Sequence, residues 1–149
     1  MEKIILTVMC MIHNLENNKV VVIKRSGDWP GITFPGGHVE ELEPITTAVI
    51  REIKEETGLD IEDPEILTIR DWCSKKDNIR NVGVLFKTSK FKGTLTSSQE
   101  GIVWWEDFNN LTNLKLADGF ELELPYFLKD IHKEMYSIII DKKEERKYF

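Results

Sequence analysis

The chain has 149 residues, of which 41% are hydrophobic and 31% charged, and its formal net charge is −6. This length and composition indicate a soluble globular protein with a single domain over residues 1–149. The acidic balance gives no support for binding a nucleic-acid polymer. It leaves room for a small nucleotide, because a bound metal ion inverts the local field.

Apolar runs and cysteines predict neither a membrane segment nor a disulfide framework. The longest candidate run, residues 138–140, is far below the roughly 18 residues of a membrane span. The apolar N-terminus lacks a small-residue cleavage site and leads into a strand-like pattern, which does not favour a signal peptide. Cys10 and Cys73 lie far apart without metal-type spacing. The sequence therefore predicts a cytoplasmic protein with buried, reduced thiols.

The first forty residues read as two strands followed by a loop. Residues 3–12 and 19–25 are rich in β-formers and are separated by a polar turn. Residues 26–37, SGDWPGITFPGG, are rich in glycine and proline and predict a long constrained loop, a place where function often lies.

Residues 44–57 predict the clearest helix. Pro44 suits the first turn, and Gly58 suits the position just past the end, where a positive φ is needed. An apolar stripe of Val49, Ile50 and Ile53 predicts the buried face.

The rest of the chain predicts strands at 64–73, 80–88 and 101–106, a second helix over about 119–135, and a final strand at 136–140. The apolar side of that helix is Phe120, Leu124, Phe127, Leu128 and Ile131. The charged end, DKKEERKYF, reads as a solvated tail. Several strands with two helices predict an α/β (α+β) fold whose mixed sheet is covered on both faces.

Three acids, Glu52, Glu55 and Glu56, adjoin one another on the helix over 44–57, at the margin of its apolar stripe. Like charges at these spacings destabilise a helix by about 0.2–0.5 kcal/mol per pair. Acids near the negative end of the helix dipole add about 0.3–1 kcal/mol each. A solvated acidic face tolerates this cost, whereas a bound cation would relieve it.

The residues that flank these acids complete a known pattern. Gly37, Glu43, Arg51-Glu52-Ile53, Glu55-Glu56 and Gly58-Leu59 meet every fixed position of a signature that covers residues 37–59. The sequence here resembles the Nudix family, and WPGITFPGGHVE resembles the approach to this box in MutT-like members. The resemblance implies the Nudix fold, an α/β/α sandwich with a mixed sheet. Leu42 replaces a frequent glycine at a variable position.

By this resemblance, Glu52, Glu56 and Glu55 are metal ligands and catalytic residues, and the carbonyl of Gly36 completes a site for Mg²⁺ or Mn²⁺. Carboxylate and carbonyl oxygens are the ligands that Mg²⁺ prefers. Arg51 is expected to orient the glutamates by ion pairing. The structural members of the box are Gly37, Glu43, which supports the loop or the ligand network, and Gly58.

Four further residues carry open alternatives. Glu100 matches a loop acid that serves as base or extra ligand, or is a solvated glutamate. Arg25 contacts phosphate, or is a surface arginine. Asp118 reads a purine edge, or caps the second helix. Trp29 stacks on a base, or anchors its loop.

The resemblance implies metal-assisted attack of water on a phosphoanhydride. For a MutT-like member the leading substrate is 8-oxo-dGTP, with the nucleoside monophosphate and pyrophosphate as products. ADP-ribose, nucleotide sugars and dinucleoside polyphosphates are alternative substrates of the same box. A non-catalytic nucleotide sensor is a further alternative. The expected partner is a small nucleotide, without nucleic-acid polymer or membrane, bound by a monomer or homodimer.

Overall fold

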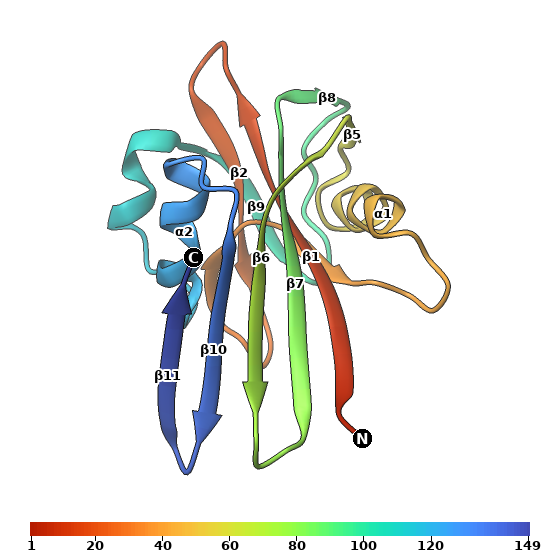
Figure 1. The fold of residues 1–149 in the computed structure, drawn as a ribbon. Helices are drawn as coiled ribbons and strands as arrows, with labels where there is room; N and C mark the ends of the chain where they lie inside the picture. Colours follow the sequence, from red (N-terminus) through yellow and green to blue (C-terminus); the bar gives the residue numbers. More distant parts are fainter.

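A computed structural model describes residues 1–149 as a mixed sheet between two helical layers (Figure 1). The main sheet has the order β11-β10-β6-β7-β1-β2-β3, with β4 also paired to β1 and β9 to β2. Its strands are β1 (Lys3–Asn14), β2 (Lys19–Arg25), β3 (Gly31–Thr33), β4 (Gly36–His38), β6 (Glu65–Ser74), β7 (Ile79–Thr88), β9 (Gly101–Asp107), β10 (Glu134–Ile140) and β11 (Lys143–Tyr148). A two-stranded sheet pairs β5 (Asp60–Glu62) with β8 (Lys90–Lys92).

The helices are α1 (Ile45–Thr57), α2 (Phe120–Leu128) and a 3-10 helix, η1 (Phe108–Asn113). In Figure 1, α1 lies on one side of the sheet and α2 with η1 on the other. The predicted α/β/α sandwich with a mixed sheet is confirmed, because β7 pairs in parallel with β1 and antiparallel with β6. Neither α helix has the length and apolar character of a membrane span.

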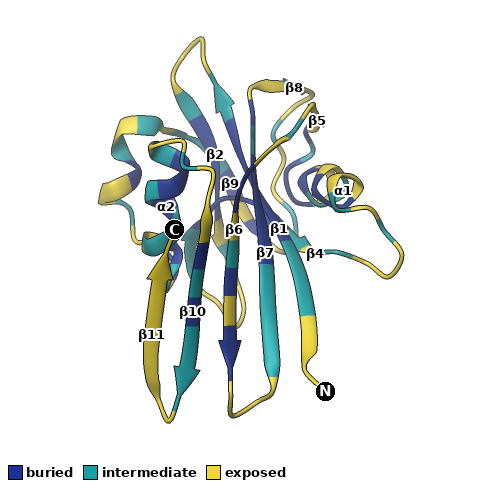
Figure 2. Ribbon diagram, viewed as in Figure 1, coloured by how far each residue is buried: buried dark blue, intermediate teal, exposed yellow.

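The central strands are buried on both faces because their apolar residues point alternately to the two helical layers. Val8, Cys10 and Ile12 of β1 join the core under α1, whereas Met9 and Met11 join the core under α2. Figure 2 shows this burial concentrated in the middle of the sheet. The sheet is therefore a rigid support for residues at its margins.

Helix α1 follows the sequence prediction closely. Gly58 adopts a left-handed φ of 78° just past the helix end, and its N–H donates to the carbonyl of Lys54 at 3.0 Å. Val49 and Ile53 are buried as expected. Ile50 is exposed, so its place in the predicted buried stripe was wrong; the turn of the helix carries it away from the sheet.

Three element predictions are corrected by the structure. Residues 26–37 are not entirely loop, because β3 pairs with β2, and β4 pairs with β1. The second helix ends at Leu128 instead of about 135, because Asp130 takes a left-handed φ of 55° and ends the helix. The charged end is not a free tail: β11 is exposed but pairs antiparallel along β10.

Replacing Gly58 with alanine should lower the free energy of unfolding by about 1 kcal/mol or more, because a Cβ is strained at this φ. The added carbon would also lie 3.0 Å from the carbonyl oxygen of Thr94. Urea denaturation of Gly58→Ala and of the exposed helical control Thr47→Ala measures this. Equal stability of Gly58→Ala and the wild type would contradict the cap assignment.

Candidate active site

The three acids of α1 differ sharply in their surroundings. Glu56 is buried, with 3% of its surface exposed. The side chain of Glu52 is 14% exposed, whereas that of Glu55 is 57% exposed. A solvated acidic face therefore describes Glu55 alone, and the other two carboxylates lie at the edge of the core.

Glu56 is held at the junction of α1, β4 and β2. The N–H of Gly36 donates to its Oε2 at 3.0 Å, and Nη1 of Arg25 lies 3.4 Å from Oε1. Arg25 also donates to the carbonyl of Gly36 at 3.3 Å and to Oγ1 of Thr33 at 3.0 Å. Burial raises the pKa of Glu56 above its usual range, while the charge of Arg25 and the Gly36 N–H oppose this.

Arg51 is the centre of the second ion-pair network. It donates two hydrogen bonds to the carboxylate of Glu43, from Nε at 2.7 Å and from Nη2 at 2.9 Å. Its Nη1 donates to Glu52 at 2.9 Å and to Glu55 at 3.1 Å, and Nη2 donates to the carbonyl of His38 at 3.0 Å. The hydrogen bonds that Glu43 accepts from Arg51, and a further one from the backbone N–H of Glu40, lower the pKa of Glu43 to about 2. Arg51 thus fixes the orientation of the Glu52 carboxylate.

Two glycines let the backbone approach this cluster. A Cβ on Gly36 would lie 2.0 Å from the carbonyl oxygen of Val8, on the neighbouring strand. A Cβ on Gly37 would lie 2.4 Å from the carboxylate of Glu52. Gly36 therefore serves strand pairing, whereas Gly37 leaves the space that the Glu52 carboxylate occupies.

The carboxylate oxygens gathered between α1 and β4 suit a hard cation that also binds water and phosphate. Glu52 and Glu56 are desolvated carboxylates, and burial is the largest cause of the raised pKa of each. A cation between them would offset that desolvation. No three acidic, histidine or cysteine side chains form a ready-made metal cage. The fit is to Mg²⁺-type coordination, in which few protein ligands are completed by water and substrate.

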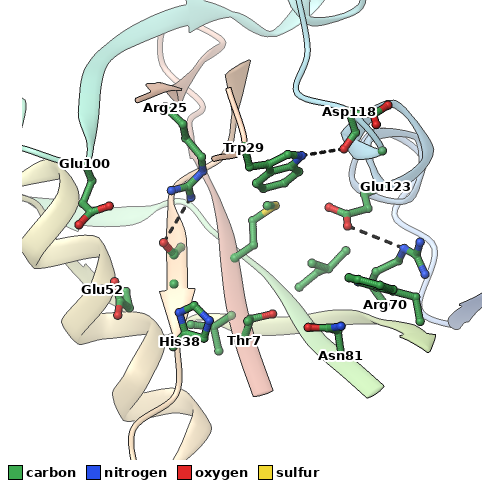
Figure 3. A pocket seen from close by; sticks show the side chains of 18 of the residues that line it. Thr7, Arg25, Trp29, His38, Glu52, Arg70, Asn81, Glu100, Asp118 and Glu123 are labelled. Carbon is green, nitrogen blue, oxygen red and sulfur yellow. Dashed lines mark hydrogen bonds and ion pairs between the residues drawn. The ribbon is translucent and has the colours of Figure 1, made fainter. Parts of the chain in front are cut away.

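A cavity of about 650 Å³ extends from these carboxylates across the sheet toward α2. Figure 3 shows Glu52 and Glu100 on one side, and Glu123 with Arg70 on the other. Glu100 stands before β9, is exposed, and lines the cavity. Arg25 is not a surface arginine, because only 14% of its side chain is exposed.

Trp29 and Asp118 meet over the cavity. The backbone of Ile32 bonds to Lys115 and Ala117, which brings the two loops together. The indole N–H of Trp29 then donates to the carbonyl of Asp118 at 2.8 Å. Trp29 is thus anchored and also lines the cavity. The helix-cap alternative for Asp118 was wrong, because Gly119 is the N-cap residue and no side chain caps α2.

Five residues that line the cavity were not predicted from the sequence: Thr7, Arg70, Trp72, Asn81 and Glu123. Arg70 and Trp72 are two residues apart on β6, so they point to one face of the sheet. Glu123 lies three residues after Phe120 and four before Phe127, on the apolar side of α2. A charged residue on an apolar helix face was the signal that could have identified it.

Comparison with known proteins places the chain in a family. The NUDIX domain model matches residues 3–130. A protein of Bacillus subtilis described as an uncharacterized Nudix hydrolase, YvcI, is 31% identical over 119 residues, covering 76% of this chain and 73% of the relative. An ADP-ribose pyrophosphatase of Methanocaldococcus jannaschii is 31% identical over 102 residues, covering 66% of this chain and 60% of that protein.

The crystal structure of a MutT protein from Bacillus halodurans has the same fold. Its TM-score is 0.80 at 20% identity, over 95% of this chain and 97% of that one. The chain therefore belongs to the NUDIX domain family and is a Nudix pyrophosphohydrolase that acts on nucleoside diphosphate derivatives. Enzymes of this family generally use divalent metal ions.

Gly37→Ala should lower the rate of hydrolysis, whereas Gly36→Ala should lower the stability of the fold. In Gly37→Ala the new carbon displaces only the flexible end of Glu52, so hydrolysis of the preferred substrate should fall roughly 100-fold. The melting temperature should stay within about 4 °C. In Gly36→Ala the clash is with backbone, so the melting temperature should fall. Full activity of Gly37→Ala would contradict the placement of Glu52.

Proposed function

We propose that this chain is a MutT-like 8-oxo-dGTP diphosphatase, which releases the nucleoside monophosphate and pyrophosphate. One observation carries the proposal. A single cavity connects the carboxylates of the Nudix box to a recess bordered by Trp29, Asp118 and Glu123, at the other end of the same sheet face. The fold similarity to a MutT protein is consistent with this substrate.

In this proposal the metal-binding residues are Glu52, Glu56 and the carbonyl of Gly36, with Glu55 at the solvent edge. A bound Mg²⁺ or Mn²⁺ would neutralise the polyphosphate and lower the pKa of an attacking water. Arg51 holds Glu52 and also bonds Glu55, whereas Arg25 holds Glu56, so each of these carboxylates is paired to an arginine. Glu43 and Gly58 support the helix and its flanking loop.

Residues outside the box would activate the attacking water and bind the nucleobase. Glu100 has no side-chain partner and faces the cavity, which suits it to accept the proton of the attacking water or to bind metal. The ring of Trp29 is fixed by its bond to Asp118 and offers a surface for stacking. Asp118 lines the recess from the loop before α2, where it would contact the base. Arg25 borders the phosphate side and lies 5.8 Å from the ring of Trp29.

A second candidate is ADP-ribose hydrolysis by the same carboxylates. The relative named as an ADP-ribose pyrophosphatase favours it. Nucleotide sugars and dinucleoside polyphosphates belong to this candidate as well. The complete set of box acids, each paired to an arginine in an ordered network, argues against a sensor that binds without turnover.

We further infer a single-domain cytoplasmic enzyme that works as a monomer or homodimer on a free nucleotide. The hairpin of β10 and β11 extends past the matched residues 3–130 but joins the main sheet, which supports one domain over 1–149. Cys10 and Cys73 are free and buried, as suits a reducing compartment.

A substrate panel tests the proposal directly. We expect pyrophosphate release with Mg²⁺ to be fastest from 8-oxo-dGTP, compared with dGTP, ADP-ribose, a nucleotide sugar and a dinucleoside polyphosphate. A preference for ADP-ribose would transfer the assignment to the second candidate. Binding without turnover of any compound would support the sensor and refute the enzyme proposal.

In the same assay, Glu56→Gln should lower kcat at least about 100-fold, because it removes a buried negative charge that the metal requires. Glu41→Gln is the matched control, since Glu41 is exposed on the loop before α1. Its kcat should equal that of the wild type. Retained activity in folded Glu56→Gln would remove this residue from the metal site.

A further inference from the structure

Strand β11 forms one edge of the main sheet and has no strand on its outer side. It is the first strand in the order of the sheet and pairs only with β10. All of its residues are exposed, and Figure 1 shows it as the outermost strand. An edge strand presents a row of backbone N–H and C=O groups that another strand can bind.

The hairpin of β10 and β11 determines which of these backbone groups are free. Its turn is Asp141–Lys142, with φ values of 50° and 65°, as a two-residue type I′ turn requires. Hydrogen-bonded and non-hydrogen-bonded pairs alternate from this turn, and the first bonded pair is Ile140 and Lys143. Farther along, the N–H of Phe149 donates to the carbonyl of Glu134 at 3.2 Å, in keeping with this alternation. The outward-facing N–H and C=O groups therefore belong to the residues in between, Glu144, Arg146 and Tyr148.

Glu144 and Arg146 place opposite charges on one face of this edge. They are two residues apart, so both side chains lie on the same face of the sheet. Nη2 of Arg146 donates to Oε2 of Glu144 at 2.7 Å, and the two side chains are 39% and 32% exposed. Glu144 also lines the cavity that holds the box carboxylates. This edge therefore carries an acid and a base beside free backbone groups, at the rim of the cavity.

We propose that β11 is a dimer interface, which pairs antiparallel with β11 of a second copy of this chain. The two copies are related by a two-fold axis perpendicular to the sheet, as in a closed dimer. In the register that we propose, Glu144 of each copy lies opposite Arg146 of the other. These residues have their backbone groups free, so each pair exchanges both of its backbone hydrogen bonds. This inference goes beyond the proposed function and holds for any substrate.

The sign of the charges favours this partner. Lysines and other charges on an edge strand discourage pairing when like charges meet. On each face of β11, however, the charges alternate in sign along the strand. In the proposed register, the face that borders the cavity has an acid opposite a base at both directly facing pairs. Opposite charges at such cross-strand positions stabilise pairing.

The other face of the paired strands is less favourable but is partly compensated. There, Lys143 lies opposite Lys147 of the partner subunit, and the two Glu145 side chains meet at the axis. Each lysine also lies diagonal to a Glu145 of the other copy, within reach of its long side chain. The pairs on the cavity face therefore select the register. They also bring the partner's Arg146 to the rim of the cavity, beside Glu144.

Sedimentation velocity of the full-length protein over a concentration series tests the interface. The wild type should show a mass twice that of the 17.4 kDa chain. Arg146→Glu and Glu144→Arg should each raise the dissociation constant at least about tenfold, because each turns both facing pairs into like charges. Lys92→Glu, which changes an exposed lysine on β8, should dimerise like the wild type.

Mixing the two single variants separates this interface from a change within one chain. Each variant alone also loses the ion pair between its own residues 144 and 146. In an equimolar mixture, however, acids of one variant face bases of the other at both positions, so heterodimers should form with nearly the affinity of the wild type. If a single variant does not fold, the double variant Glu144→Arg with Arg146→Glu should dimerise, because it restores opposite charges within and between copies.

Hydrogen exchange gives a backbone readout. In the wild-type dimer, the amides of Glu144 and Arg146 should exchange at least about tenfold more slowly than the same two amides in the Arg146→Glu monomer. The amide of Glu145, which bonds to β10, should be protected in both. A monomeric wild type at every concentration would overturn the proposal. So would a dimer that both single variants leave intact, or a mixture of the two variants that stays monomeric.

Discussion

Burial of the Glu56 carboxylate between α1 and the sheet is the constraint on which the site depends. A charge at that depth requires partners, and the backbone N–H of Gly36 and the guanidinium of Arg25 supply them. These contacts fix the end of α1 against β4 and β2. The register of β4 on β1 then sets the position of Gly37, and with it the space for Glu52. An acid at an unfavourable end of a helix is thus part of the framework, as well as a metal ligand in the proposed function.

Each end of the cavity holds a largely buried carboxylate beside one arginine. At the box, Glu56 lies 3.4 Å from Arg25; beside α2, Glu123 lies 3.8 Å from Arg70. Both separations exceed those of tight charged hydrogen bonds, which are about 2.7–2.9 Å. Each carboxylate is therefore only partly compensated by its arginine. In the proposed function, a cation would bind at the first end, and the base would lie in the recess at the second.

Local sequence signals predicted the frame of this molecule, and non-local pairing accounts for most of what they missed. Helix α1, its cap at Gly58 and the long strands follow from periodicity and turn residues. The short strands β3 and β4 depend on partners elsewhere in the chain, and β11 is a charged strand whose order comes from pairing with β10. The box acids were evident from spacing. Glu123 was not, because its importance arises only when α2 faces β6 across a cavity.

The central claim is that one nucleotide spans the cavity, with its phosphates at the box and its base against α2. A crystal structure with Mn²⁺ and a non-hydrolysable 8-oxo-dGTP analogue would locate both the metal and the base. An anomalous difference map would identify the manganese. We predict manganese bound by Glu52, Glu56 and the Gly36 carbonyl, with the base in the recess bordered by Trp29, Asp118 and Glu123. Manganese bound elsewhere, or a base lying outside the recess, would contradict it.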